Sequence, residues 1–256
     1  MKFSCEKHLL QSAVLAASRA ASAKSPISAL EGLLIQAGAG VRVTGYDLKK
    51  GIYMNIEADV AQSGSAVLMT AKLFSEMMRL LPDGVVTVEV GDDSRATVKC
   101  GQSEYSFMAL PAADYPELPD VDISEAIMIP QKTLRSMIDE SIFAVSTNES
   151  RPVYMGSLFE LEGGRLTMVS VDGYRMAIRR EEVKGGTEGM RFIIPGSALL
   201  DVERLCDDSD EEVLLNVGTK HSSFTIGDTV VVSRKLEGDF LNYKKSLPEN
   251  FRHVVS

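Results

Sequence analysis

The chain of 256 residues has no tryptophan and only three cysteines, and the scarcity of cysteine excludes some classes of protein. Cys5, Cys100 and Cys206 are far apart and odd in number, so they indicate neither a disulfide framework nor a zinc site. A reduced, cytoplasmic protein is therefore expected. No apolar run approaches the roughly 18–20 residues that span a membrane, and Glu6 and Lys7 interrupt any signal-peptide core. No membrane association is expected.

Recognisable catalytic and cofactor motifs are also missing. The histidines, His8, His221 and His253, lie in no nucleophile arrangement with serine, cysteine or aspartate. The sequence contains no HExxH, GxxxxGK[ST] or GxSxG. The acidic run DDSDEE, residues 207–212, lacks the central glycine and the terminal glutamate spacing of an EF-hand loop. The sequence thus predicts no enzyme, no metal site and no cofactor.

The composition is that of an ordinary globular protein, with 45% hydrophobic and 25% charged residues. The length allows two domains with cores of normal size. The net charge of −9, taken alone, argues against a general nucleic-acid binder. How that charge is distributed along the chain is a separate question.

The two halves of the chain contain helical and strand-like segments in the same order. Apolar residues recur at helical spacing over residues 9–21, 73–81, 134–145 and 199–206, with short alternating runs between them. A shift of 125 residues superposes the halves without a gap and aligns Asp47 with Asp172. We therefore interpret the chain as an α+β protein built from two copies of one domain.

A proline-rich acidic stretch separates the copies. Residues 110–126, LPAADYPELPDVDISEA, carry three prolines among five acidic residues and are expected to form an extended connector. Residues 236–251 are the matching connector of the second copy, and the last five residues align with the first strand of each copy. The predicted domains are 1–122 and 123–248, with 249–256 beginning a third copy. The chain is thus predicted to be a fragment of a three-domain protein.

Four stretches together resemble the beta subunit of bacterial DNA polymerase III, the family of replicative sliding clamps. They are MKFSCEKHLLQSAV at the start, LLIQAGAGVRVTGYDLKKGI, MALPAADYPELP and LFELEGGRLTMVSVDGYRMAI. The resemblance covers essentially the whole chain, as the first two of the family's three domains. It implies the DNA-clamp fold, with tandem domains that each have two helices packed on antiparallel sheets. It also implies a processivity factor that tethers polymerase by topology rather than by catalysis.

A sliding ring needs weak, sequence-independent phosphate contacts on the helices that line its hole. The helical segments 6–24, 71–81, 131–145 and 196–206 sum to +2, which leaves −11 for the rest of the chain. By match to the family's DNA-facing positions, the resemblance assigns contact with double-stranded DNA to Lys24, Lys72, Arg79 and Asn148. The fourth helix opens PGSALL, where family members often place basic residues, so contact is expected mainly in the first domain.

The resemblance further implies an apolar pocket, between the second and third domains, that takes a short linear peptide of partner proteins. Met176 and Leu241 are expected to supply its walls, and Arg175 a donor or a stacking plane. Family members usually have Thr-Asp-Gly-His-Arg-Leu where this chain has VDGYRM, so the family's peptide preference does not carry over directly. The second-domain share of the pocket is expected at Tyr154, Val171, Gly173, Tyr174, Arg175, Met176, Leu241, Lys245 and Ser246.

At the turn Asp172-Gly173, a residue expected to serve the fold is followed by residues expected to serve the pocket. Both residues are expected at the centre of a tight two-residue hairpin. The equivalent Asp47 is followed by Leu48 instead of glycine. The aspartate is therefore assigned to the architecture of the domain, and residues 173–176 to the pocket of the second copy alone.

The partners implied by the resemblance are the DNA polymerase III alpha subunit, the clamp loader and other proteins that carry a clamp-binding motif. The full-length protein is expected to form a homodimeric ring, and this chain to be monomeric, because the family's subunit contact joins a first domain to a third. Three alternatives stay open. They are a two-domain subunit that assembles as a trimer, an enzyme handling a small molecule or nucleotide on duplicated α+β domains, and a peptide-binding module that never meets DNA.

Overall fold

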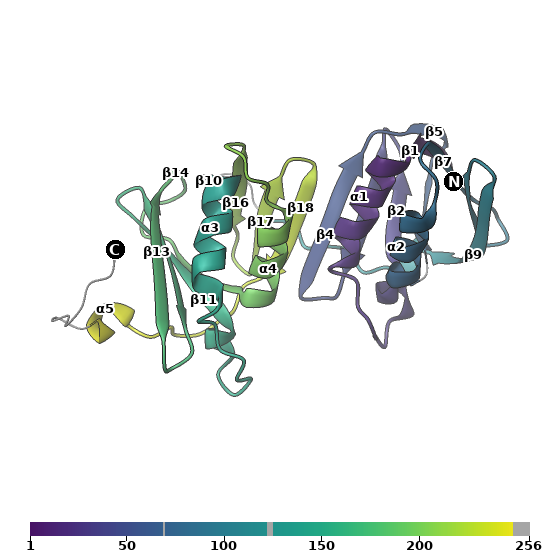
Figure 1. The fold of residues 1–256 in the computed structure, drawn as a ribbon. Helices are drawn as coiled ribbons and strands as arrows, with labels where there is room; N and C mark the ends of the chain where they lie inside the picture. Colours follow the sequence, from purple (N-terminus) through teal and green to yellow (C-terminus); the bar gives the residue numbers. More distant parts are fainter. Residues whose placement is uncertain (69, 122–124, 248–256) are drawn as a thin grey trace.

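The computed structural model describes residues 1–68, 70–121 and 125–247, and it contains two copies of one α+β architecture side by side (Figure 1). The first copy has helices α1 (Lys7–Ser18) and α2 (Ala71–Leu80), with short 3-10 turns η1 (Ser28–Glu31) and η2 (Ala112–Asp114). Its strands are β1 (Lys2–Glu6), β2 (Leu33–Ala37), β3 (Val41–Tyr46), β4 (Lys50–Ile56), β5 (Asp59–Gln62), β6 (Gly64–Leu68), β7 (Val85–Val90), β8 (Arg95–Cys100) and β9 (Ser103–Pro111).

The second copy has helices α3 (Gln131–Ile142) and α4 (Gly196–Leu205), the 3-10 turn η3 (Pro152–Met155) and a short helix α5 (Tyr243–Ser246). Its strands are β10 (Ile127–Pro130), β11 (Gly156–Glu162), β12 (Arg165–Val171), β13 (Met176–Glu182), β14 (Lys184–Gly185), β15 (Arg191–Pro195), β16 (Glu212–Val217), β17 (His221–Ile226) and β18 (Thr229–Arg234). All of the strand pairs are antiparallel, as the predicted fold class requires.

The internal repeat is confirmed by the order of these elements. Helices α1 and α3 begin 124 residues apart, and α2 and α4 begin 125 residues apart. The predicted extended connector is only partly confirmed, because residues 110–111 end β9 and η2 follows at once. Pro111 has φ near −58°, which suits the edge of a strand as well as an extended linker. The predicted boundary at 122–123 and the predicted third copy from 249 lie outside the described residues.

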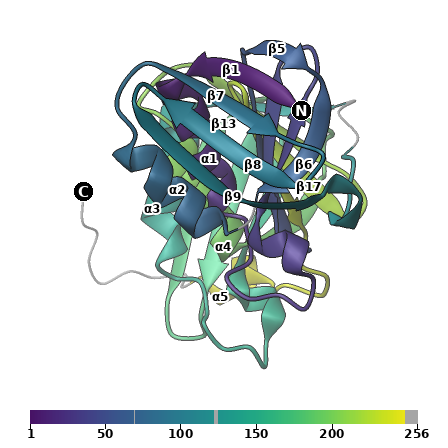
Figure 2. The same cartoon turned by 90° about the vertical axis from the view of Figure 1, so that its right-hand side faces the viewer.

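A single long sheet runs through both copies. Within the described residues it has 14 strands, and the first and second copies meet in it through β4 and β18. These two strands pair antiparallel, with Ile52 opposite Val231. A separate four-stranded sheet, in the order β13-β12-β11-β15, belongs to the second copy. Figures 1 and 2 show helices α1 to α4 on one side of the molecule.

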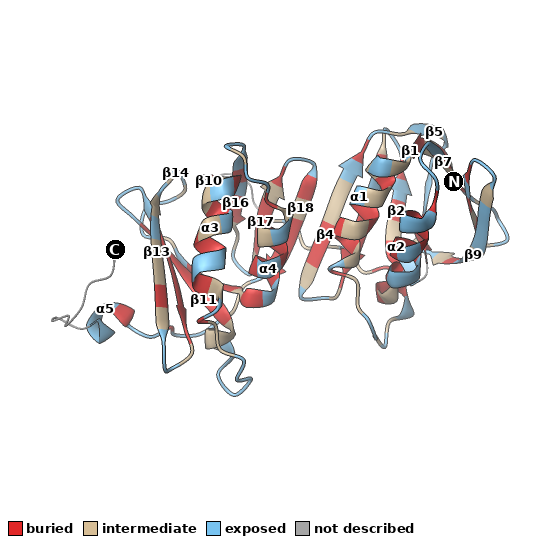
Figure 3. Ribbon diagram, viewed as in Figure 1, coloured by how far each residue is buried: buried red, intermediate tan, exposed pale blue. Residues whose placement is uncertain are grey.

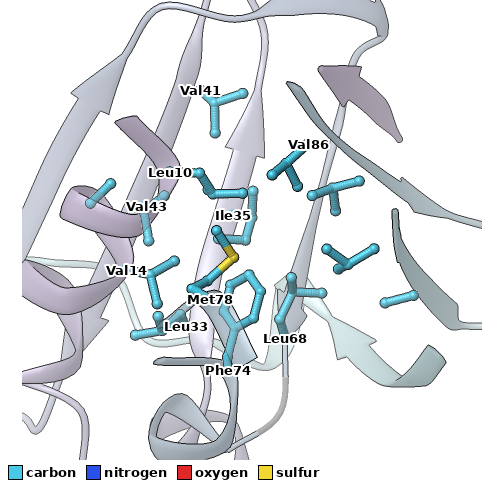
Figure 4. Close-up of a cluster of buried hydrophobic side chains, with 14 of the residues drawn as sticks. Leu10, Val14, Leu33, Ile35, Val41, Val43, Leu68, Phe74, Met78 and Val86 are labelled. Atoms are coloured by element: carbon cyan, nitrogen blue, oxygen red, sulfur yellow. The ribbon is translucent and has the colours of Figure 1, made fainter. Parts of the chain in front are cut away.

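The core of the first copy lies between its helix pair and its strands (Figure 4). Helix α1 buries Leu10 and Val14, four residues apart, because that spacing puts both on one helix face. Phe74 and Met78 do the same in α2. Gly45 in β3 lets α1 come close to the sheet, because a Cβ there would lie 2.0 Å from the carbonyl oxygen of Ala17.

The two copies share buried surface as well as a sheet. Ile52 of β4 and Ala16 and Ala20 of α1 are buried among the core residues of the second copy. Figure 3 shows buried residues along β4 and β18, where the copies meet. Lys50 of β4 forms an ion pair with Asp201 of α4, and both side chains are nearly buried. The copies are therefore packed against each other as one body.

Candidate nucleic-acid interface and partner pocket

The side of the molecule that carries the helices has a hollow of about 550 Å³ between the end of α1 and the start of α2. Arg19, Lys72 and Arg79 line it, together with Ser22 and Glu76. Helices α1 and α2 are joined at this point by a hydrogen bond of 2.7 Å between the hydroxyls of Ser18 and Ser75. The helix pair thus brings three cations together on one face.

Two of the four residues predicted to contact DNA, Lys72 and Arg79, meet in this hollow. Arg19 joins them, and the prediction did not include it as a contact. The signal was its place one residue after an amphipathic helix, on the side that carries the other cations. Lys24 is exposed in the loop after α1, where its carbonyl oxygen accepts a hydrogen bond from the Ser22 hydroxyl. Lys24 does not line the hollow.

Asn148 occupies the corresponding loop of the second copy, after α3, and is exposed. Its side-chain oxygen accepts a hydrogen bond of 3.0 Å from the Ser150 N–H, and its own backbone N–H donates to the Ser146 hydroxyl at 3.1 Å. These two bonds hold the loop after α3 in place through its backbone.

The cations Lys132 and Arg135 of α3 have carboxylate partners on or after α4. Lys132 lies 2.7 Å from Asp210, and the hydrogen bond to Asp210 raises the pKa of Lys132. Arg135 lies 4.0 Å from Glu203. In contrast, no carboxylate of the described residues lies within 4.0 Å of Arg19, Lys72 or Arg79. The described charges therefore favour anion contact at the first helix pair, where the cations form no ion pair, although Glu31 and Glu76 line the same hollow.

The residues predicted for the partner pocket do not all meet. Val171, Tyr154 and Met176 belong to one apolar cluster with Phe240 and Tyr243 of the chain after β18. The ring of Tyr154 packs edge-on against Phe240, with centroids 5.4 Å apart. These residues form a continuous apolar surface beside the β12–β13 hairpin.

The hairpin tip is built differently from the sequence prediction. The Asp172 carboxylate accepts hydrogen bonds from the N–H of Tyr174 at 3.0 Å and of Arg175 at 3.1 Å. These bonds, the one from Tyr174 first, hold the pKa of Asp172 below its ordinary value. Gly173, with φ of +95°, is the first central residue and Tyr174 the second, so the prediction of Asp172 at the centre was wrong. A glycine in this first position is typical of a type II′ turn.

Tyr174 and Arg175 are not part of the apolar cluster. Tyr174 is fully exposed at the hairpin tip. Arg175 forms an ion pair of 2.8 Å with Asp172, and its guanidinium lies 5.5 Å from the ring centre of Phe143 at the end of α3. The predicted stacking plane of Arg175 is therefore occupied within the chain, by a half-exposed aromatic ring that the prediction did not include.

The segment that follows β18 carries the rest of the predicted pocket. Leu241 is 37% exposed, and Lys245 and Ser246 are exposed on α5. Tyr243 anchors this segment, because its hydroxyl donates a hydrogen bond of 2.7 Å to Glu160 of β11. Lys244 adds an ion pair of 2.9 Å with Glu162. The sequence reasoning missed these anchors, and the aromatic residues on both sides of Leu241 were the available signal.

A second apolar surface, on α2 and β9, was not predicted at all. Leu73, Leu80, Tyr105 and Met108 are between 40% and 78% exposed and line a hollow of about 370 Å³. The first part of β9, residues 103–108, pairs with β8 on one side, whereas β6 pairs only with residues 109–111. An open strand edge beside exposed apolar side chains is typical of a protein interface.

The described part of the chain offers few other groups for catalysis, metal binding or membrane insertion. The thiols of Cys5, Cys100 and Cys206 are buried, and burial raises the pKa of Cys5 to about 11 and that of Cys206 to about 12. No group of three or more histidine, cysteine or acidic side chains is placed there to hold a metal ion. None of the described helices combines the length and the apolar character needed to cross a membrane.

Comparison with known proteins gives one family for both copies. Residues 1–119 match the DNA polymerase III beta subunit, N-terminal domain, and residues 128–242 match the central domain of the same subunit. The beta sliding clamp of Halalkalibacterium halodurans is 32% identical over 263 residues, which cover 97% of this chain and 68% of that protein. The beta sliding clamp of Bacillus subtilis is 30% identical over 265 residues, covering 100% of this chain and 70% of the relative.

Solved structures agree with the sequence relatives. The DNA polymerase sliding clamp of Bacillus subtilis superposes with a TM-score of 0.93 at 30% identity, covering 98% of this chain and 68% of that structure. A sliding clamp of Pseudomonas aeruginosa bound to griselimycin superposes with a TM-score of 0.91 at 26% identity, with the same coverage of 98% and 68%.

Proposed function

The chain belongs to the DNA polymerase III beta-subunit family of DNA sliding clamps, and from this premise we propose that its helix face holds duplex DNA without reading the sequence. The observation that carries the proposal is the cation group Arg19, Lys72 and Arg79, which lines a hollow on that face without a carboxylate partner among the described residues. Cationic side chains of this kind bind phosphates weakly and at any sequence, as sliding requires. Lys24 and Asn148 extend the proposed contact through equivalent loops of the two copies.

The proposed role is mechanical. A subunit that encircles DNA and holds a polymerase keeps the polymerase on its template by topology, and it needs no catalytic group of its own. We expect such a protein in the cytoplasm with the replication machinery. The proposed partners are the DNA polymerase III alpha subunit, the clamp loader and other proteins that carry a clamp-binding motif.

The apolar surface of Tyr154, Val171, Met176 and Leu241 is the proposed docking place for partner peptides. Its character supports this role, because apolar walls next to an orienting hairpin suit short linear peptides. The bound griselimycin of the Pseudomonas aeruginosa clamp is a further sign that a protein of this fold takes a ligand. Gly173 keeps the hairpin tip narrow, and Lys245 and Ser246 on α5 would meet the flanks of a peptide. Tyr174 would meet it only as an exposed side chain at the rim.

The apolar surface of α2 and β9 is proposed to join subunits into a ring. The open edge of β9 could pair with a strand of another subunit, while Leu80 and Met108 become buried beside it. The full-length protein is proposed to be a homodimeric ring closed in this way through a third domain. The chain of 256 residues, by itself, is proposed to be monomeric.

Binding of a short random-sequence DNA duplex, followed by fluorescence anisotropy over a series of salt concentrations, tests the DNA proposal. The triple variant R19Q/K72Q/R79Q should bind more weakly, and the slope of log K against log salt should fall by about 0.9 for each phosphate that the variant no longer neutralises. A control of equal charge change, K2Q/K99Q/K184Q, removes three lysines on strands and should leave the slope near that of the wild type. Equal slopes for the two variants would refute the assignment of the helix face.

If the wild-type chain binds no duplex even at low salt, the alternative of a peptide-binding module that never meets DNA gains support. Light scattering of the same samples addresses assembly. A stable trimer would contradict the proposed monomer and would favour the two-domain subunit considered from the sequence. A concentration-independent monomer is the expected result.

A further inference from the structure

A cluster of basic residues lies where the turn between β16 and β17 meets the end of β18. His221 of β17 is paired with Arg234 of β18. One residue further out, the N–H of Lys235 donates a hydrogen bond of 2.9 Å to the carbonyl oxygen of Lys220. Four basic residues therefore occupy adjacent positions at the start of β17 and the end of β18, Lys220 and Lys235 just outside the strands. The N–H of Arg234 also donates to the carbonyl oxygen of Lys49 at 2.9 Å, which adds a fifth, from the first copy.

Beside this cluster is a small hollow of about 210 Å³. Lys220, Lys235 and Arg191 line it on the polar side, and Leu158 and Phe240 on the apolar side. We call it the basic hollow. It holds three cationic side chains in a protein whose net charge is −9. A local concentration of positive charge on an acidic protein is a place where an anionic partner would be attracted selectively.

The basic hollow lies at the β15 edge of the four-stranded sheet, and apart from Phe192 its residues from that sheet belong to the face away from the helices. Successive side chains of a strand point to opposite faces. Phe159 of β11 and Ile194 of β15 are buried in the core together with α3 and α4. Their neighbours Leu158 and Ile193 belong to the other face and line the hollow. DNA held on the helix face would therefore lie on the opposite side of this sheet.

Few acidic groups compensate these cations. Glu237 lines the hollow, but it is 74% exposed and lies 3.9 Å from Arg234. Arg191 is engaged by Glu160 at 3.1 Å. No carboxylate of residues 1–68, 70–121 or 125–247 lies within 4.0 Å of the Lys220 or Lys235 ammonium groups. Neither lysine therefore forms an ion pair among these residues, although the exposed Glu237 acts on Lys235 through its charge.

The pKa of His221 is consistent with positive charge around it. Burial lowers the pKa of Lys235 below its ordinary value, and the charge of Glu237 opposes that shift. Burial also lowers the pKa of His221, and the charges of Arg234, Lys220 and Lys235 lower it further. An anion bound among these groups would relieve that repulsion. The free energy gained in this way would add to the direct attraction between opposite charges.

One aromatic side chain connects the basic hollow to the proposed peptide surface. Phe240 lines the hollow and also packs edge-on against Tyr154, with ring centroids 5.4 Å apart. Leu241, the next residue, is 37% exposed at the proposed peptide surface. The proposed peptide surface and the basic hollow are therefore adjacent and share Phe240.

We propose that the basic hollow binds a run of carboxylates in a partner protein, adjacent to the segment that docks on the apolar surface. The kind of partner follows from the charges: an acidic protein segment meets Lys220 and Lys235 on the face away from DNA. The proposed function supplies the position of the partner's docking segment, whereas the carboxylate site itself stands on the geometry of the hollow. The carboxylates would form exposed, charge-assisted hydrogen bonds, whose strength falls as salt is added.

A fluorescent peptide of consecutive glutamates is the probe, and its glutamine counterpart is the neutral reference. Anisotropy at low salt should show binding of the glutamate peptide and much weaker binding of the glutamine peptide. The variant K220Q/K235Q should bind the glutamate peptide about tenfold more weakly, as expected when two exposed ion pairs are removed. The control K99Q/K184Q makes the same charge change elsewhere and should bind like the wild type.

Charge reversal gives a second test that does not depend on loss of binding. The variant K220E/K235E should lose the glutamate peptide and bind a peptide of consecutive lysines instead. Circular dichroism checks that both double variants are folded. Equal binding of the glutamate peptide by K220Q/K235Q and K99Q/K184Q would overturn the proposal. The proposal would also be overturned if a short single-stranded DNA displaced the bound peptide at a lower concentration than unlabelled glutamate peptide does. The site would then prefer nucleic acid.

These outcomes are distinct from failure of the proposed function. Binding of the glutamate probe does not require that DNA or a docking peptide binds, and the helix-face variant R19Q/K72Q/R79Q separates the basic hollow from the cations of the helix face. Conversely, R19Q/K72Q/R79Q should bind the glutamate peptide like the wild type. Loss of glutamate binding in that variant would place the carboxylate site on the helix face and refute the basic hollow.

Discussion

The hydroxyl of Tyr243 donates a hydrogen bond of 2.7 Å to the carboxylate of Glu160, across 83 residues of chain. Tyr243 is 2% exposed, and Glu160 also meets Arg191 and Lys244 at 3.1 and 3.6 Å. This hydrogen bond fixes the segment after β18 against the outer face of the four-stranded sheet. The position of Leu241, and with it one wall of the proposed peptide surface, depends on that fixed segment.

Replacing Tyr243 with phenylalanine should therefore destabilise the second copy without creating a cavity in its core. The ring stays in place, and the hydrogen bond to a charged acceptor is removed. We expect a decrease of about 1.5–3 kcal/mol in the free energy of unfolding, measured by urea denaturation. The exposed Tyr174 provides the control, and Y174F should unfold like the wild type. A Y243F variant as stable as Y174F would show that the hydrogen bond contributes nothing to the fold.

The same hydrogen bond predicts a dependence of stability on alkaline pH. Burial, followed by the hydrogen bond to Glu160, raises the pKa of Tyr243 from 10.0 to about 12. A group whose pKa is raised in the folded state stabilises that state below its unfolded pKa and loses the effect as pH rises through the folded value. The stability difference between the wild type and Y243F should thus be complete below pH 10 and shrink between pH 10 and pH 12. Urea midpoints of both proteins over this interval measure it, and a constant difference would contradict the assignment.

The Lys50–Asp201 ion pair should affect the free energy of unfolding more than ion pairs on the surface do, because it joins the two copies and is nearly buried. The side chains are 12% and 7% exposed. Removal of one partner leaves a buried charge alone, so D201N and K50M should each cost about 3–5 kcal/mol of unfolding free energy. The double variant K50M/D201L should cost less than the sum of the two single changes. A double-mutant cycle in urea measures the coupling, and additive effects would show that the charges act independently.

Gly45 tests the close approach of α1 to the sheet. A methyl group there would collide with the backbone oxygen of Ala17, which cannot move without moving the helix. The G45A variant should therefore lose about 1–3 kcal/mol or more of stability. Gly38 is the matched control, because a Cβ at that position meets nothing within 4 Å. Thermal unfolding should show G38A within about 0.5 kcal/mol of the wild type, and equal effects of the two variants would refute the close approach.

Periodicity was enough to predict the helices and the repeat. Residues such as Leu10 and Val14, or Phe74 and Met78, mark one face of a helix by spacing alone, and the structure buries all four. Alternating runs located the strands for the same reason. Periodicity does not predict which strands, far apart in the sequence, become neighbours in the sheet. The pairing of β4 with β18 depends on the packing of two whole copies, and no local pattern around Ile52 predicts it.

The same distinction between local spacing and tertiary geometry applies to the candidate sites. The predicted Lys72 and Arg79 lie together because both are on one exposed side of α2, and helical spacing determines that. Arg175 is predicted to face a peptide, and in the structure its guanidinium lies over Phe143, a residue 32 positions earlier. A contact between a hairpin tip and the end of a helix depends on tertiary geometry. The resemblance to a family supplied the position of Arg175 but not the direction of its side chain.

The pairing of β4 with β18 also determines what either copy would do alone. Separated from its neighbour, each copy would present the unpaired N–H and C=O groups of a strand with buried side chains, Ile52 in one and Val231 in the other. Such an edge recruits strands from other molecules. The seam between the copies thus protects the chain from self-association, and half-length pieces cut between β9 and β10 should be prone to aggregate where the intact chain stays dispersed.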